Sequence, residues 1–416
     1  MSKRRTVLRR LGVGAGVVGL GVGGAWYGGL IGPTEPEPTA DETDGMEQSD
    51  DGSGRDESDE TEREVDPPAE DWRTFQYDHG NTGRVPDGNG LGEDREELWR
   101  FDLEDETRSD PVVADGTVFL GCGDGVLYAI GAADGEERWR FEAGISIASG
   151  PAVDDGTVYF GSDGVYALDA ETGTQRWKYD GTHTAQRASP TVRDGTVYVV
   201  NIDRDVVALD AADGEERWRF ETDHWVRTYA AVTEDTAFVA SSDGHAYAID
   251  AADGEERWRF ETAGTIQSAP TVVDDTVLVG SFDGSDPSGG LHALDVADGT
   301  ERWFFETLDD PASPAVADGT VYVTGGALHA VDVADGTEQW SVNYWTGELT
   351  APIVADGAVY VGSLDERLYV IDPADGEERW THRFDGRIAA TPAIMGGFAF
   401  VGDVDGTVYA LHGPTE

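Results

Sequence analysis

The eleven residues Ala208-Leu209-Asp210-Ala211-Ala212-Asp213-Gly214-Glu215-Glu216-Arg217-Trp218 return, with variations, six more times in this 416-residue chain. The copies span residues 129–139, 167–177, 248–258, 293–303, 330–340 and 370–380. Each copy ends in a tryptophan, and one further tryptophan lies in the stretch 98–101. The eight tryptophans follow one another at intervals of 37 to 45 residues and are Trp99, Trp139, Trp177, Trp218, Trp258, Trp303, Trp340 and Trp380. A period of this length fits a propeller blade of four short strands.

Each repeat unit also contains the signals of four strands. In the unit that ends at Trp218, short β-branched and aromatic runs occupy residues 189–192, 196–200, 206–209 and 217–220. Asp-Gly pairs between the runs favour tight hairpins, because both residues tolerate positive φ. The last of eight units begins at Pro392 and lacks its tryptophan strand, whereas the strand 98–101 has no three strands before it. We therefore predict an all-β, eight-bladed β-propeller whose ring is closed by strand 98–101 in the last blade.

The first 71 residues differ from the repeats in composition. Residues 1–32 carry five basic side chains and then an uncharged run, and Arg4-Arg5-x-x-Leu8 is typical of a twin-arginine export signal. A plain N-terminal membrane anchor is the alternative, and cleavage stays open. Residues 33–71 contain 17 acidic residues against two arginines, so we expect a disordered linker. The propeller then spans residues 72–416, outside the cell or tethered to the outer face of the cytoplasmic membrane.

The charge of the chain excludes several functions. Its formal net charge is −54, and only two of its 29 cationic residues are lysine. Nucleic-acid binding and docking on anionic lipid both need clustered cations, so we expect neither, and the membrane is reached only through the N-terminal segment. Because salt screens self-repulsion, the composition resembles that of halophilic, haloarchaeal proteins. One cysteine, Cys122, allows no intrachain disulfide, and the histidines show no metal-binding spacing.

The repeated phrase resembles the tryptophan-docking motif of PQQ-like (pyrroloquinoline quinone) repeat propellers, which include quinoprotein dehydrogenases and the BamB family of barrel-assembly lipoproteins. The opening of residues 71–83 also resembles the start of such domains. The resemblance implies that each of the eight tryptophans packs between neighbouring blades. It further implies that the loops leading into the first strand of each blade form the cofactor face in the catalytic members. It leaves function open, because the repeated motif is structural.

Residues that interrupt the repeat in those loops are the candidate binding residues, since binding sites on propellers lie on loops. They are His183, Arg187, Asp223, His224, Trp225, Arg227, Tyr229, Asn343, Trp345, Glu348 and Arg387. They include the arginines, aromatic rings and oxygen ligands that PQQ and a calcium ion need. The catalytic members are longer, however, and many carry a vicinal cysteine pair, which one cysteine cannot form.

We therefore expect a non-catalytic scaffold with no catalytic residue, no metal site and no cofactor. Its partner would be a protein, peptide or glycan at the cell envelope, and the chain itself would be a monomer. The alternative is a PQQ- and calcium-dependent quinoprotein dehydrogenase that oxidises alcohols or sugars.

Overall fold

The structure is a computed structural model that describes residues 66–69, 71–86, 90–181, 189–200, 204–284, 289–343 and 346–413, together with two short strands, β1 (Leu20–Gly21) and β2 (Gly24–Ala25). The rest of the predicted signal 1–32 and most of the predicted linker 33–71 lie outside the described residues. Among the residues that are described, we find no helix with the length and apolar character needed to cross a membrane.

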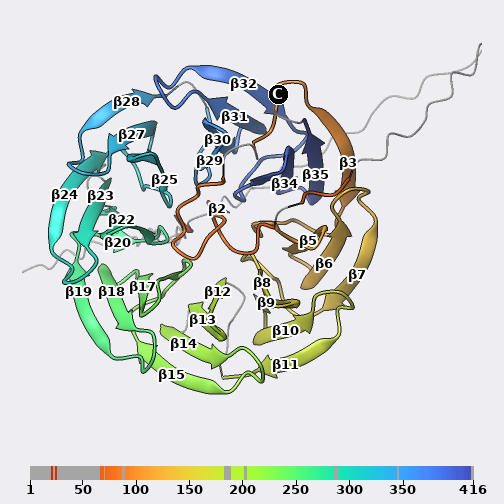
Figure 1. Ribbon diagram of the computed structural model, residues 1–416, viewed down its shortest axis with the longest axis horizontal. Coiled ribbons are helices and arrows are strands. Elements are labelled where there is room, and N and C mark those ends of the chain that lie inside the picture. Colours follow the sequence, from red (N-terminus) through yellow and green to blue (C-terminus); the bar gives the residue numbers. More distant parts are fainter. Residues whose placement is uncertain are drawn as a thin grey trace, which may run out of the picture.

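Eight antiparallel sheets stand around a central axis, with the chain passing from each sheet to the next (Figure 1). Blade 1 consists of β4 (Val112–Ala114), β5 (Thr117–Gly121), β6 (Val126–Gly131) and β7 (Glu137–Glu142), and blade 2 of β8 (Ala152–Asp154), β9 (Thr157–Gly161), β10 (Val165–Asp169) and β11 (Gln175–Tyr179). Blade 3 consists of β12 (Ser189–Arg193), β13 (Thr196–Val200), β14 (Asp205–Asp210) and β15 (Glu216–Glu221). Blade 4 consists of β16 (Ala231–Val232), β17 (Thr236–Ala240), β18 (His245–Asp250) and β19 (Glu256–Glu261).

Blade 5 has a fifth strand, β20, whereas the remaining blades keep four strands. Blade 5 consists of β20 (Thr265–Ile266), β21 (Thr271–Val273), β22 (Thr276–Phe282), β23 (Gly289–Asp295) and β24 (Glu301–Thr307). Blade 6 consists of β25 (Ala315–Ala317), β26 (Thr320–Thr324), β27 (Leu328–Asp332) and β28 (Glu338–Val342), and blade 7 of β29 (Ile353–Ala355), β30 (Ala358–Ser363), β31 (Arg367–Ile371) and β32 (Glu378–Arg383). Blade 8 consists of β33 (Ala393–Met395), β34 (Phe398–Gly402), β35 (Thr407–His412) and β3 (Glu96–Asp102). The predicted all-β, eight-bladed propeller is confirmed.

The last blade combines the two ends of the propeller. Its outer strand, β3, pairs antiparallel with β35, and Trp99 lies opposite Ala410 in the register. This pairing agrees with a ring closed by residues 98–101. It leaves no blade with an unpartnered third strand, which would otherwise offer free hydrogen-bonding groups.

The tryptophans hold neighbouring blades together, as Trp218 illustrates. Its indole N–H donates to the carbonyl oxygen of Ala251 in the next blade at 3.0 Å, and its side chain is 7% exposed. Gly254 lies against the ring with φ +76°, and a Cβ there would come within 2.8 Å of the indole. A glycine is therefore required in the Asp-Gly turn, both for its backbone conformation and for the close contact. Trp380 differs, because the Arg95 guanidinium lies 3.6 Å from the centre of its ring.

Residues 71–86, which we call the axial segment, fill the middle of the ring (Figure 1). Their backbone exchanges hydrogen bonds with the innermost strands of six blades. The bonds, between 2.7 and 2.8 Å long, join Trp72 to Val113, Arg73 to Val153, His79 to Val232, Gly80 to Val272, Thr82 to Val316, and Gly83 and Val85 to Val354. The chain thus lines its own channel with backbone that is already paired, and the Asn81 side chain also donates to a backbone carbonyl of a surrounding blade, that of Pro270, at 3.0 Å.

Candidate functional site

The loops that lead into the first strand of each blade, here called leading loops, gather at one end of the ring, because the strands of all blades run in the same sense. The Asp-Gly turns between first and second strands lie at the opposite end. The chain reaches the axial segment at that opposite end, where a Cβ on Gly116 would lie 3.3 Å from Pro67. The leading-loop face therefore lies opposite the end at which Pro67 contacts the propeller.

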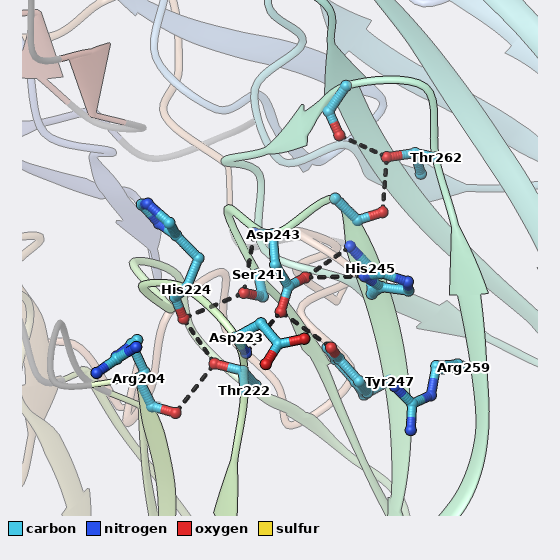
Figure 2. Close-up of polar contacts among 12 residues, drawn as sticks. Arg204, Thr222, Asp223, His224, Ser241, Asp243, His245, Tyr247, Arg259 and Thr262 are labelled. Atoms are coloured by element: carbon cyan, nitrogen blue, oxygen red, sulfur yellow. Dashed lines mark hydrogen bonds and ion pairs between the residues drawn. The ribbon is translucent and has the colours of Figure 1, made fainter.

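Hydrogen bonds to its backbone fix the leading loop of blade 4 (Figure 2). The Thr222 hydroxyl lies 2.6 Å from the carbonyl oxygen of His224 and 3.0 Å from that of Arg204. The Ser241 hydroxyl lies 3.3 Å from the same His224 oxygen, and the backbone N–H of Asp223 donates to Asp243. Two neighbouring hairpins therefore hold the loop in place, so the residue that follows His224 projects from a rigid base.

Trp225 is that residue, and 43% of it is exposed. The guanidinium of Arg227 lies 4.2 Å from the centre of its ring, and the His224 ring lies 4.9 Å away. A guanidinium over an indole face is a favourable cation–π arrangement that restricts both side chains. Three of the predicted residues thus form one aromatic and cationic cluster, in which His224 and Trp225 are exposed and Arg227 is half-buried.

Tyr229, at the end of the same loop, lies on the axis instead of the surface. Its ring stacks on Phe75 of the axial segment, with ring centres 4.0 Å apart and an interplanar angle of 1°. Its hydroxyl donates to a carboxylate oxygen of Asp110 at 2.7 Å and accepts from the Gly150 N–H at 2.8 Å. The second Asp110 oxygen accepts from the N–H of Thr391 at 2.7 Å. The Tyr229 side chain of blade 4 therefore reaches across the channel to blades 1 and 2, and Asp110 extends the connection to blade 8.

The channel accommodates Tyr229 because neighbouring residues are small. Ala269 and Ala351 complete the apolar cluster around Phe75 and Tyr229, and a Cβ on Gly150 would come within 2.7 Å of the tyrosine hydroxyl. Burial raises the pKa of Asp110, although its hydrogen bonds to Tyr229 and Thr391 act in the opposite direction. The axis is thus closed by two stacked rings and a carboxyl group that resists ionisation.

A second group of acids lies on the leading loops of blades 6 and 7. The Gln267 amide donates to one oxygen of Asp310 at 3.1 Å, while the other oxygen is buried and has no hydrogen-bond partner among the described residues. Burial, followed by the carboxylates of Asp309 and Glu348, raises the pKa of Asp310 to about 7. Desolvation and Asp309 also raise the pKa of Glu348. Added negative charge is therefore unfavourable on this part of the face.

The other predicted residues do not join one pocket in the described structure. The Asn343 amide donates to the carbonyl oxygen of Gly326 on blade 6 at 2.8 Å, and Arg387 is exposed on the leading loop of blade 8. His183, Arg187 and Trp345 lie outside the described residues. Within the part of the chain that is described, no group of three or more His, Cys, Asp or Glu side chains could hold a metal ion.

Sequence reasoning missed four residues that shape this face: Phe75, Asp110, Gln267 and Asp310. A signal for Asp110 was present, because Asp110, Tyr229 and Thr391 occupy the same position: one residue separates each from the first strand of its blade. Ordering the units by this position, rather than by their tryptophans, would have placed these residues in one ring around the axis. No comparable signal marks Phe75, which lies outside the repeats.

Fold and site define a PQQ-like repeat propeller, and a family model identifies the group within that class. The model for outer membrane protein assembly factor BamB matches residues 91–144, 123–228, 205–343 and 324–415. The chain belongs to this family. A search of curated proteins gave no match.

Solved structures show the same fold at low sequence identity. BamB from Moraxella catarrhalis is 19% identical, with a TM-score of 0.65 over 76% of this chain and 99% of that one. Quinohemoprotein alcohol dehydrogenase from Comamonas testosteroni is 16% identical, with a TM-score of 0.70 over 83% of this chain and 81% of that one. The computationally designed Ika8 protein is 17% identical, with a TM-score of 0.67 over 76% of this chain and 99% of that one. An assembly factor, an enzyme and a designed protein thus share the architecture, so the fold alone does not define the function.

Proposed function

We propose that this chain is an exported, salt-adapted propeller that binds a protein or peptide partner on its leading-loop face and has no catalytic activity. The observation that carries the proposal is the closed axis. Phe75 and Tyr229 occupy the middle of the ring, and Tyr229 is hydrogen-bonded to Asp110. Among its described residues, the face presents the exposed Trp225 beside the half-buried Arg227, and tryptophan and arginine dominate binding energy at protein interfaces.

The described residues of this face do not fit PQQ. The cofactor carries three carboxylates and would bring negative charge beside Asp110, Asp310 and Glu348, whose pKa values are already raised. The described part of the chain also contains no group of acids suited to a calcium ion. The dehydrogenase alternative therefore rests on likeness of fold, and a direct assay separates it from the scaffold.

That assay adds PQQ and Ca²⁺ to the purified chain in concentrated KCl. It records the absorbance spectrum and the dye-linked oxidation of alcohols and sugars. We expect no turnover. Turnover that is lost on Arg227→Ala would overturn the scaffold proposal.

Binding is tested by capturing partners from envelope extract in high salt. We expect Trp225→Ala to reduce capture about tenfold or more, because truncating an interface tryptophan commonly costs 2 kcal/mol or more. Phe304→Ala is the matched control, since Phe304 is 49% exposed but lies on an outer strand, β24. Equal loss in both variants, or none in either, would contradict a partner site at Trp225.

Export is tested separately from binding. Replacing Arg4-Arg5 by Lys-Lys keeps the charge but removes the arginine pair that the twin-arginine pathway requires. We expect the variant chain to stay in the cytoplasm while the native chain reaches the cell surface. Unchanged secretion of the variant would refute dependence on this pathway.

A further inference from the structure

A groove of about 450 Å³ lies at the seam between blades 1 and 2, on the side away from the leading loops. Phe119 and Trp139 line its apolar part, and Arg138, Arg176 and Glu171 line its polar part. Trp139 keeps partial exposure there, as Trp340 and Trp380 do in their blades, whereas the equivalent Trp177 and Trp218 are 8% and 7% exposed. A cavity of this size suits a small molecule.

The groove coincides with a break in the repeat. In blades 2 to 5 the arginine that precedes the docking tryptophan bonds both a threonine of the second strand and an aspartate at the end of the third strand. In blade 2, Arg176 donates to Thr157 at 2.5 Å and to Asp169 at 3.0 Å. The same pairs recur for Arg217, Arg257 and Arg302. Each of these blades thus carries an arginine clamp that joins its second, third and fourth strands.

Blade 1 lacks the clamp because Gly131 stands where blades 2 to 7 have an aspartate. Arg138 turns to Asp134 instead, at 2.6 Å, and its guanidinium occupies the vacated space. A Cβ on Gly131 would lie 2.3 Å from an Arg138 nitrogen. Thr117, the threonine of this blade, is left as part of the groove wall. The groove therefore lies where a glycine replaces the aspartate of the clamp.

The chemistry of the wall points to a neutral ligand rich in hydroxyl groups. Arg138 and Arg176 are already ion-paired, with Asp134 and Asp169, and Asp115 and Glu171 also line the groove, so no uncompensated positive charge remains to attract an anion. Their side chains are still 41% and 42% exposed, which leaves N–H donors facing solvent, and Glu171 offers acceptor oxygens. The tryptophan and phenylalanine rings supply an apolar surface beside these donors and acceptors.

We propose that this groove binds a neutral saccharide. A pyranose ring matches the wall in both respects: its C–H face packs on an aromatic side chain, and its hydroxyl groups donate and accept hydrogen bonds. Concentrated salt screens charges but weakens neither contact, so the site suits a salt-adapted surface.

The test is saturation-transfer NMR on the full chain in concentrated KCl, with methyl α-D-glucopyranoside, methyl α-D-mannopyranoside and maltose as probes. We expect at least one probe to receive saturation from the protein. Gly131→Asp restores the residue of the other blades and should return Arg138 to Thr117, closing the groove and weakening binding at least tenfold. Glu171→Gln, in an exposed turn, should weaken binding severalfold with no loss of folding.

Gln339→Arg serves as the matched control, because it completes the arginine position in blade 6, away from the groove. It should leave binding unchanged. Absence of transfer to all three probes, or full binding by a folded Gly131→Asp chain, would overturn the proposal. So would displacement of the sugars by sulfate at equal concentration, since that result would identify an anion site.

Discussion

Replacing Asp310 by Asn should change how the stability of the propeller depends on pH. The carboxyl group is largely buried, one of its oxygens has no hydrogen-bond partner among the described residues, and its pKa is raised to about 7. The folded state therefore holds a proton that the unfolded state releases near the ordinary value of 3.8. Stability is fully present below that value and falls as the pH rises toward 7, because ionisation is penalised in the folded state alone.

The size of the effect follows from the difference between the two pKa values. A separation of about three units corresponds to about 4 kcal/mol, which is an upper limit for a single group. At about pH 8 the Asp310→Asn chain should therefore be more stable than the native chain by up to about 4 kcal/mol. At about pH 4 the two chains should be equally stable, because the native carboxyl is then protonated in the folded state.

Urea denaturation in concentrated KCl, followed by tryptophan fluorescence at several pH values, measures this difference. Asp309→Asn is the comparison variant: it removes one neighbouring charge, so the pH dependence should become shallower without disappearing. A constant stability difference between Asp310→Asn and the native chain at every pH would refute the reasoning. It would show that the carboxyl does not titrate in this range.

Three further changes test the packing of the ring. Tyr229→Phe keeps the ring stack but removes the hydroxyl that bonds Asp110, and it should cost about 1–3 kcal/mol in urea unfolding; an unchanged midpoint would contradict a closed axis. Gly214→Ala places a methyl group 2.8 Å from Trp177 at φ +76° and should lower the melting temperature, whereas alanine at an exposed strand position should not. Deleting residues 1–103 removes both the axial segment and the outer strand of blade 8, whereas deleting residues 1–95 removes the axial segment and keeps β3; hydrogen exchange in blade 8 should be faster in the shorter chain, and equal exchange in the two would argue against β3 as a closing strand.

The architecture could be predicted from the sequence because local signals that recur in every unit indicate it. The interval between tryptophans, the Asp-Gly turns and the incomplete last unit together gave the number of blades. The site could be predicted only where one loop carries it, as with Trp225 and Arg227. Tyr229 and Asp110 are 119 residues apart and meet across the ring. The repeat shows which residues occupy equivalent positions, but it does not show which side chain reaches across the axis.

Residue-by-residue comparison of the repeats would have revealed more. Gly131 is an ordinary turn-side glycine when its blade is read alone, and it becomes informative only beside Asp169 and Asp210. The groove depends on the position that the Arg138 side chain takes when Gly131 replaces the aspartate, and packing determines that position. Departures from a repeat are thus visible in sequence, whereas their spatial result is not.

The axial segment has a mechanical consequence. Any pull on the chain N-terminal to residue 66 reaches the propeller through residues 71–86, whose backbone bonds six blades. The load would first meet the bonds of Trp72 and Arg73 to blades 1 and 2, with the remaining four blades behind them. Tension would therefore be shared around the ring instead of peeling one blade from its edge, and the closing strand β3 would be shielded until the whole segment had been drawn out. A propeller held at this point would therefore resist tension with six blades at once.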